Sequence, residues 1–282
     1  MNRILVCSDG SNYAQVCCRY AAWLAQRNGA QVEILYVTDL RYFEIPLVAD
    51  LGGSLGMQPY QAVLGQLQEL ERKKAGIVLD EARRIMEEAG LSSGRVHTSH
   101  KTGLLVDCLT DHEKNAEIVL LGKRGENANF ATEHLGSTME RVVRASTRPC
   151  LVTSRAFHDI KRVALAYDGG PSSRRAAEFL ANSDVLKGLE LHIVIVAGGM
   201  SADVAVQHLR EAEAIARAGG FSPVCQMLHG TPEDEIAAYV AGSDIQLLVM
   251  GAYGHGRIRR LIIGSTTTDM VRTCHVPVLL LR

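Results

Sequence analysis

The chain has 282 residues, a length that suits one large domain or two of moderate size. It carries 30 lysines and arginines against 31 aspartates and glutamates, and this balance argues against a general nucleic-acid-binding protein, which usually has an excess of basic residues. The hydrophobic share is 47%, there is no long uncharged apolar run or signal-peptide pattern, and the seven cysteines form no Cys-x-x-Cys pair. These features predict a folded cytoplasmic protein with reduced thiols and no membrane span.

The first half of the chain has a pattern of alternating strands and helices. Five short apolar runs are predicted to be strands: Ile4–Cys7, Val32–Val37, Arg95–Thr98, Ile118–Leu121 and Cys150–Thr153. Four segments have helical spacing: Ala14–Asn28, Glu71–Ala89, Leu104–Lys114 and Ser137–Thr147. Gly29 and Gly90 follow the first two helices, where glycine can adopt the left-handed conformation that ends a helix.

The segment at about 39–70 has no counterpart in the second half. It contains Pro46, Gly52, Gly53 and Pro59, residue types that favour turns. Two predictions stay open for it: a long loop or lid over a site, and an unstructured surface insertion.

The second half repeats the alternation. Its predicted strands are Val163–Ala166, Leu191–Val196, Pro223–Met227, Leu247–Met250 and Val278–Leu281. Thr231 and Pro232, followed by two acidic residues, predict a helix start, because a threonine cap, an early proline and negative charge all favour the positive end of a helix. The strands are continuous apolar runs, which is typical of parallel strands covered by helices on both faces.

Similarity between the halves indicates a duplication. Three pairs of short motifs correspond: Asp9-Gly10 with Asp168-Gly169, Gly122-Lys-Arg-Gly125 with Gly251-Ala-Tyr-Gly254, and Gly136-Ser137-Thr138 with Gly264-Ser265-Thr266. We therefore predict an α/β protein of two repeated doubly wound, Rossmann-like domains, each with a five-stranded parallel sheet. The predicted domains are residues 1–155, which include the insertion, and residues 156–282.

The carboxyl ends of the strands are the expected place for a ligand, because open parallel sheets bind ligands where the strand order reverses. If the first strand lies beside the fourth, the turn with Asp9 or Asp168 meets the glycine-rich loop of the same half. Glycines let the backbone approach a ligand, and the helix after Gly264 begins with unpaired N–H groups. This combination predicts a phosphate site. A tight turn with an ordinary helix cap explains the same residues equally well.

Other nucleotide and catalytic motifs are absent. The sequence has neither the P-loop pattern nor Gly-x-Ser-x-Gly. Gly254 and Gly256 begin a dinucleotide fingerprint, but Arg259 stands at its third glycine position. The ten histidines form no set with zinc spacing, and the run from Asp111 to Glu113 is expected to face solvent at a helix end. We assign no catalytic residue and no metal ligand.

The chain resembles a tandem universal stress protein over nearly its whole length. The ATP-binding signature of that family is Gly-x2-Gly-x9-Gly-Ser/Thr, and half two matches it in full at Gly251, Gly254, Gly264 and Ser265. The resemblance implies an adenine nucleotide, ATP with or without Mg²⁺, whose phosphates these four residues and Thr266 would hold.

The resemblance also implies which residues contact the nucleoside part of the nucleotide. Asp168 would contact the nucleoside, and Val196 and Met250 would line the base pocket. His255, within the glycine loop, is a further candidate for a phosphate contact.

Half one departs from the signature. Ten residues separate Gly125 from Gly136, whereas nine separate Gly254 from Gly264. Segment 126–135 has two glutamates and no lysine or arginine, whereas segment 255–263 has three arginines. Lys123 and Arg124 offset only part of this difference. We therefore predict that ATP binds mainly to half two. The weaker candidates of half one are Asp9, Val37, Gly122, Gly125, Gly136 and Ser137.

Two functions follow from the resemblance. The first is an ATP-binding regulatory protein of the stress response, with adenine nucleotide and unidentified proteins as partners. The alternative is a scaffold that binds no nucleotide and acts through protein contacts. The strand Val278–Leu281 is apolar and could pair at a sheet edge. In the family that the chain resembles this strand commonly mediates dimer contacts, so the resemblance implies an internal pseudo-dimer of the two halves or a homodimer of the chain. Slow ATP hydrolysis or self-phosphorylation at 265–268 has no catalytic constellation to support it.

Overall fold

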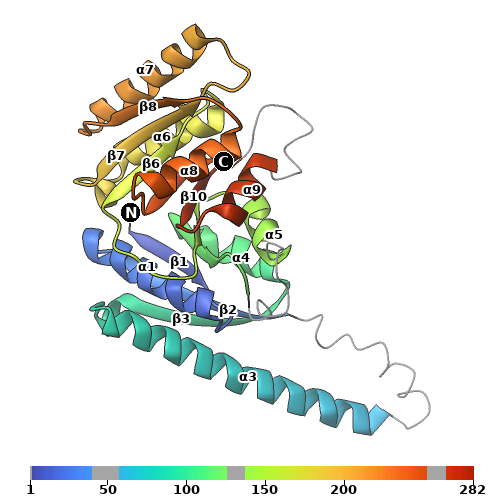
Figure 1. Ribbon diagram of the computed structural model, residues 1–282. Helices are drawn as coiled ribbons and strands as arrows, with labels where there is room; N and C mark the ends of the chain where they lie inside the picture. Colours follow the sequence, from blue (N-terminus) through green and yellow to red (C-terminus); the bar gives the residue numbers. More distant parts are fainter. Residues whose placement is uncertain (1, 40–56, 126–136, 253–264) are drawn as a thin grey trace.

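The computed structural model describes residues 2–39, 57–125, 137–252 and 265–282 (Figure 1). Within these residues ten strands form one sheet in the order β3-β2-β1-β4-β5-β10-β9-β6-β7-β8. The strands of half one are β1 (Arg3–Cys7), β2 (Gln31–Asp39), β3 (Val96–Gly103), β4 (Ile118–Gly122) and β5 (Cys150–Thr153). Those of half two are β6 (Arg162–Ala166), β7 (Glu190–Val196), β8 (Val224–Leu228), β9 (Leu247–Gly251) and β10 (Val278–Leu281).

Helices cover both faces of this sheet. They are α1 (Asn12–Asn28), α3 (Met57–Glu88), α4 (Leu105–Glu113), α5 (Ser137–Ala145), α6 (Pro171–Asn182), α7 (Ala202–Ala218), α8 (Pro232–Gly242) and α9 (Ser265–Thr273), with 3-10 turns at Ser93–Arg95 and Asp184–Leu186. One buried apolar cluster contains residues of α1, α3, α6 and α7, and the other contains residues of α4, α5, α8 and α9. The predicted doubly wound α/β fold is confirmed.

Each half has the strand order that the predicted site needs. β1 pairs in parallel with both β2 and β4, and β6 pairs in parallel with both β7 and β9. The first strand of each half therefore lies beside the fourth, and the order of the strands reverses between them. The turn after the first strand and the loop after the fourth leave the same edge of the sheet.

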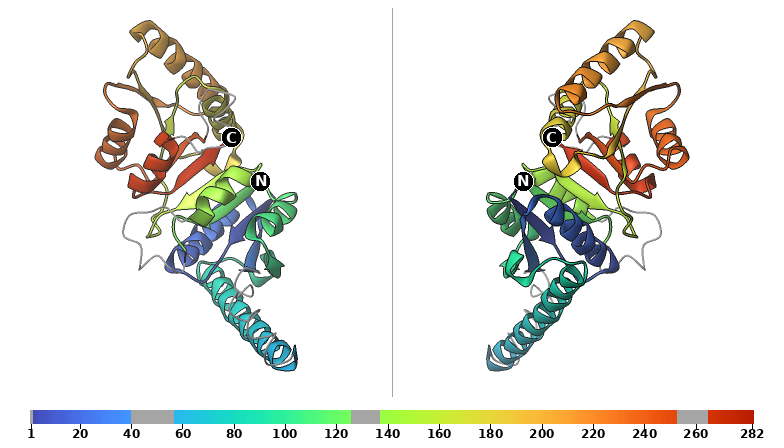
Figure 2. Two further views of the ribbon diagram at one scale, coloured as in Figure 1. Left: turned by 90° about the vertical axis from the view of Figure 1, so that its right-hand side faces the viewer. Right: turned by 90° about the vertical axis from the view of Figure 1, so that its left-hand side faces the viewer.

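The two halves join through their last strands, which run antiparallel. Leu279 lies opposite Leu151, between the pairs Val278–Val152 and Leu280–Cys150. All six side chains are buried. Figure 2 shows the halves on opposite sides of this junction. The predicted pairing of the strand Val278–Leu281 is confirmed, and its partner is the last strand of the other half.

Local signals set several helix ends. Ser11 caps α1 by accepting the N–H of Ala14, and Gly29 ends the helix at a φ of 76° while its N–H reaches the carbonyl oxygen of Ala25. Thr231 and Pro232 stand at the N-cap and first turn of α8, as predicted, although the Thr231 side chain makes no capping bond.

The prediction for the insertion is wrong over residues 57–70, which belong to α3 and not to a loop; residues 40–56 lie outside the described part of the chain. Pro59 lies in the first turn of α3, where a helix tolerates proline because the first N–H groups have no partner within the helix. The helix projects from the body of the molecule (Figures 1 and 2).

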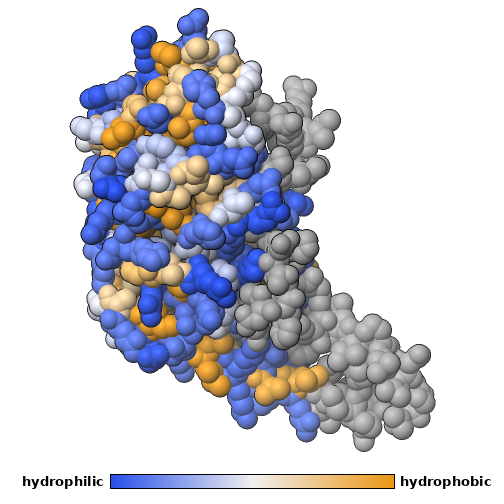
Figure 3. Space-filling view, in the orientation of Figure 1, coloured by the Kyte–Doolittle hydropathy of each residue, from blue (hydrophilic) through white to orange (hydrophobic). Residues whose placement is uncertain are grey.

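The projecting helix exposes apolar side chains, visible in the lower part of Figure 3. Among the side chains of α3 that the structure describes, Leu70 is 62% exposed and Ile77 is 71% exposed. A search of the described residues finds no helix with the length and apolarity that a membrane crossing requires.

Candidate functional site

The two Asp-Gly turns after β1 and β6 have the same construction. Asp168 Oδ1 accepts the N–H of Gly170 at 2.8 Å and the hydroxyl of Ser173 at 2.6 Å. Asp9 Oδ1 accepts the N–H of Ser11 at 3.0 Å. The glycine after each aspartate has a positive φ, 75° at position 169, so the tight turn favours glycine there. Both turns present a carboxylate at the strand end, and Asp168 is exposed.

The structure brings each aspartate to the glycine-rich segment of its own half. A Cβ built on Gly125 would lie 2.7 Å from Asp9 Oδ2. In half two, a Cβ on Gly251 would lie 2.8 Å from the backbone nitrogen of Ser173, the residue whose hydroxyl holds Asp168. In each half, the aspartate turn therefore packs against a glycine of the motif, Gly125 in half one and Gly251 in half two.

The residues predicted for the base pocket lie near the ends of the two strands that flank β6, the strand before Asp168. Val196 ends β7 and Met250 lies in β9, with exposed fractions of 9% and 6%. Both belong to the same apolar cluster as Ala166, the last residue of β6. The half-one counterpart, Val37, is only partly buried.

The phosphate end is described only in part. α9 begins at Ser265 and α5 begins at Ser137, so the predicted helix starts are present in both halves. The Thr267 hydroxyl donates to the carbonyl oxygen of Ala252 at 3.1 Å and ties the first turn of α9 to the end of β9. Four predicted residues lie outside the described part of the chain: Gly136, Gly254, His255 and Gly264. The side chains of Ser137, Ser265 and Thr266 are not described either.

The described part of half two fits an adenine nucleotide chemically. The apolar side chains of Val196 and Met250 suit a base, and the fixed carboxylate of Asp168 can accept hydrogen bonds from ribose hydroxyls. The start of α9 offers N–H groups and a partial positive charge to phosphate.

His208, which lies on α7 and covers the Asp168 turn, is not predicted from the sequence. A Cβ on Gly169 would collide with the His208 ring, so the imidazole rests directly on the turn. In half one, Val78 of α3 covers Gly10 in the same way, at 2.8 Å from a built Cβ. No local signal identifies either contact, because it depends on how a distant helix packs.

The hydrogen-bond partners of Lys123 are not predicted from the sequence either. Its Nζ donates to the carbonyl oxygens of Arg272 and, at 3.3 Å, Cys274, both at the end of α9 in the other half. Burial lowers the pKa of the Lys123 ammonium to about 8, and the nearby Arg124 and Arg272 also lower it. The expected contribution of Lys123 to the charge of the half-one loop is therefore corrected, since its ammonium group binds half two.

Comparison with known proteins gives the family. The model of the universal stress protein family matches residues 1–154 and again residues 159–282. The chain belongs to the universal stress protein family.

The relatives match this chain over nearly its whole length. A universal stress protein of Synechocystis sp. is 42% identical over 289 residues, covering 100% of both chains. A universal stress protein of Mycolicibacterium smegmatis is 25% identical, covering 99% of this chain and 96% of the relative. The crystal structure of a universal stress protein from Archaeoglobus fulgidus superposes with a TM-score of 0.73 at 24% identity, covering 100% of this chain and 96% of that one.

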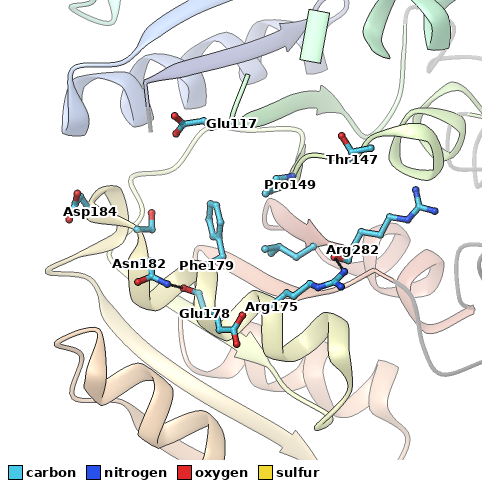
Figure 4. A pocket seen from close by; sticks show the side chains of 11 residues that line it. Glu117, Thr147, Pro149, Arg175, Glu178, Phe179, Asn182, Asp184 and Arg282 are labelled. Carbon is cyan, nitrogen blue, oxygen red and sulfur yellow. Dashed lines mark hydrogen bonds between the residues drawn. The ribbon is translucent and has the colours of Figure 1, made fainter. Parts of the chain in front are cut away.

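A groove of about 410 Å³ lies between the two universal stress domains, away from the predicted nucleotide site (Figure 4). Carboxylates of Glu117, Glu178 and Asp184 and guanidinium groups of Arg175 and Arg282 lie around it. Arg175 donates to the carbonyl oxygen of Arg282 at 2.8 Å. Because residues of both halves line the groove, we interpret it as part of the junction.

One expectation for the first domain is wrong. Asp111 is exposed and pairs with Lys114 at 2.8 Å, but Glu113 does not face solvent and is only 2% exposed. Its carboxylate accepts the hydroxyl of Ser146 at 2.5 Å and the N–H of Thr147 at 3.0 Å. Glu113 thus fixes the turn before β5, a contact between residues far apart in the sequence.

Proposed function

We propose that the second universal stress domain binds ATP, with or without Mg²⁺, and that the protein is a cytoplasmic regulator of the stress response. The observation that carries the proposal is the exposed carboxylate of Asp168, which is fixed by Ser173 where the strand order reverses, while the backbone of Ser173 packs against Gly251. This position coincides with a complete Gly-x2-Gly-x9-Gly-Ser motif.

We assign the roles of the residues as the resemblance implies. Asp168 contacts the nucleoside, Val196 and Met250 contact the base, and the segment from Gly251 to Thr266 binds the phosphates, with Gly254, His255, Gly264 and Ser265 as its candidate contacts. The three arginines of segment 255–263 add positive charge for the phosphates. We place the domain boundary at about residue 155, and the two matches of the family model support this division.

We further propose that half one binds ATP weakly or not at all. The ammonium of Lys123 contacts α9 and is not directed to the half-one helix start. Segment 126–135 brings two glutamates to that loop without a lysine or arginine. Both features disfavour a polyphosphate next to Asp9 and Gly125.

Titration of the full chain with ATP tests the proposal, with Asp168→Asn and Asp9→Asn as a matched pair. Asparagine keeps an oxygen that can accept the N–H of the turn, so the turn survives while the charge is lost. We expect Asp168→Asn to weaken ATP binding about tenfold, in line with the loss of a hydrogen bond to a charged group. Asp9→Asn should leave the main affinity unchanged.

A larger effect of Asp9→Asn than of Asp168→Asn would contradict the ranking of the two halves. The scaffold alternative predicts a different result. A ligand that binds only the folded state raises the thermal unfolding midpoint, so a scaffold that binds no ATP would show no rise at millimolar ATP.

A further inference from the structure

The two helices that follow the glycine motifs are each held at their C-terminal end by a cation from the other half. Lys123 of half one donates to the carbonyl oxygens of Arg272 and Cys274 at the end of α9. Arg282 of half two donates from Nη1 to the carbonyl oxygen of Arg144, in the last turn of α5, at 2.8 Å. The two contacts cross the junction in opposite directions.

A cation in this position stabilises a helix. The last carbonyl groups have no partner within the helix and carry a partial negative charge. α9 has nine residues, so it is about 13 Å long. A positive charge at its C-terminal end and an anion at its N-terminal end therefore act on the same short dipole.

Lys123 lies inside the glycine motif of half one, between Gly122 and Gly125. Half two has Ala252 in the corresponding place, where the side chain is buried and the N–H donates to the carbonyl oxygen of Leu281 at 2.7 Å. Half one therefore has a cation directly after the first glycine of its motif, where half two has an alanine. This cation serves the other half, because its ammonium bonds to the end of α9.

We propose that Lys123 is a positioning residue for α9, the helix whose N-terminal end is the proposed phosphate site of half two. Through this contact, half one sets the nucleotide affinity of the other domain. By holding the C-terminal end of α9, Lys123 keeps the helix ordered with its N-terminal N–H groups directed to the ligand. The role in binding rests on the proposed function, whereas the role in holding α9 does not.

The test uses full-length Lys123→Met, with Lys123→Arg as the conservative variant and Arg282→Met as the matched control on α5. ATP and adenosine affinities are measured by calorimetric titration. We expect Lys123→Met to weaken ATP binding about three- to tenfold, the range of a helix-end charge in a partly buried site. Adenosine affinity should not change, Lys123→Arg should restore most of the ATP affinity, and Arg282→Met should bind ATP as the wild type does.

Hydrogen exchange of the nucleotide-free variants gives the second readout. The amides in the last turn of α9 should exchange faster in Lys123→Met and at the wild-type rate in Arg282→Met. Unchanged exchange in Lys123→Met, or equal losses of ATP and adenosine affinity, would overturn the proposal. If the wild-type chain binds no ATP, the proposed function fails, and the exchange rates still decide whether Lys123 holds α9.

Discussion

Steric packing within the protein is enough to explain why the first residue of each motif is glycine, without any ligand. A Cβ on Gly251 would lie 2.8 Å from both Ser172 Cβ and the backbone nitrogen of Ser173, at the start of α6. A Cβ on Gly122 would lie 2.7 Å from Tyr13 Cβ in α1. The close approach of the first helix of each half to its fourth strand therefore requires glycine there. The rest of the motif must carry the argument for a nucleotide.

Gly251→Ala should consequently destabilise the fold itself. The added methyl group meets backbone atoms that cannot move aside, and we expect a loss of about 1–3 kcal/mol in the free energy of unfolding, the usual cost of overpacking. Denaturant titration without nucleotide measures it. Gly242→Ala is the control, because a Cβ there meets nothing within 4 Å. Equal stability of the two variants would show that the approach of α6 does not constrain Gly251.

At the scale of elements, buried polar contacts fix how α4, α5 and β5 meet. Glu113 ends α4, and its carboxylate accepts hydrogen bonds from Ser146 and Thr147 in the turn between α5 and β5. Arg148 donates from Nε to the carbonyl oxygen of Glu113 at 3.2 Å. Helix α5 therefore has a defined end, anchored to the helix before it.

Glu113→Ala should lower the free energy of unfolding by about 2 kcal/mol, because it removes the charged acceptor of the buried Ser146 hydroxyl and of the Thr147 N–H. Asp111→Ala, two residues earlier and exposed, removes only a surface ion pair and should change stability by less than about 1 kcal/mol. Chemical denaturation of both variants measures the difference. Similar losses for the two would mean that the turn finds other acceptors.

At the scale of the molecule, the two domains share one sheet and both apolar clusters. The antiparallel pairs of β5 and β10 make the sheet continuous, and each cluster contains side chains from both halves. Arg27 of α1 adds a polar contact across the junction, to the carbonyl oxygen of Val185 at 2.6 Å. Neither half can unfold without exposing apolar surface of the other.

We therefore expect the full chain to unfold in one cooperative transition. Scanning calorimetry should give a single peak whose calorimetric and van't Hoff enthalpies agree. ATP should move this peak as a whole, even though the proposed site lies in one domain. Two resolved transitions, with only the second shifted by ATP, would show that the domains are thermodynamically independent.

Local patterns in the sequence determined the strands, the duplication and the fold. Apolar runs such as Leu247–Met250 coincide closely with β9, and Gly29 ends α1 as predicted, because buried strands and left-handed helix ends depend on residue types in short windows. The paired Asp-Gly turns and glycine motifs also placed the candidate site at the strand ends. Local signals failed at Pro59, where a residue that favours turns lies in the first turn of a helix.

Only the tertiary structure decided which side chains contact residues that are far away in the sequence. The contact of Lys123 with α9, the cover of His208 over Gly169 and the burial of Glu113 each join residues far apart in the chain. Such contacts depend on where whole elements pack, and a charged residue has the same local pattern whether it faces water or the end of another helix. The sequence therefore located the candidate site, whereas the packing of the two halves decided which residues support it.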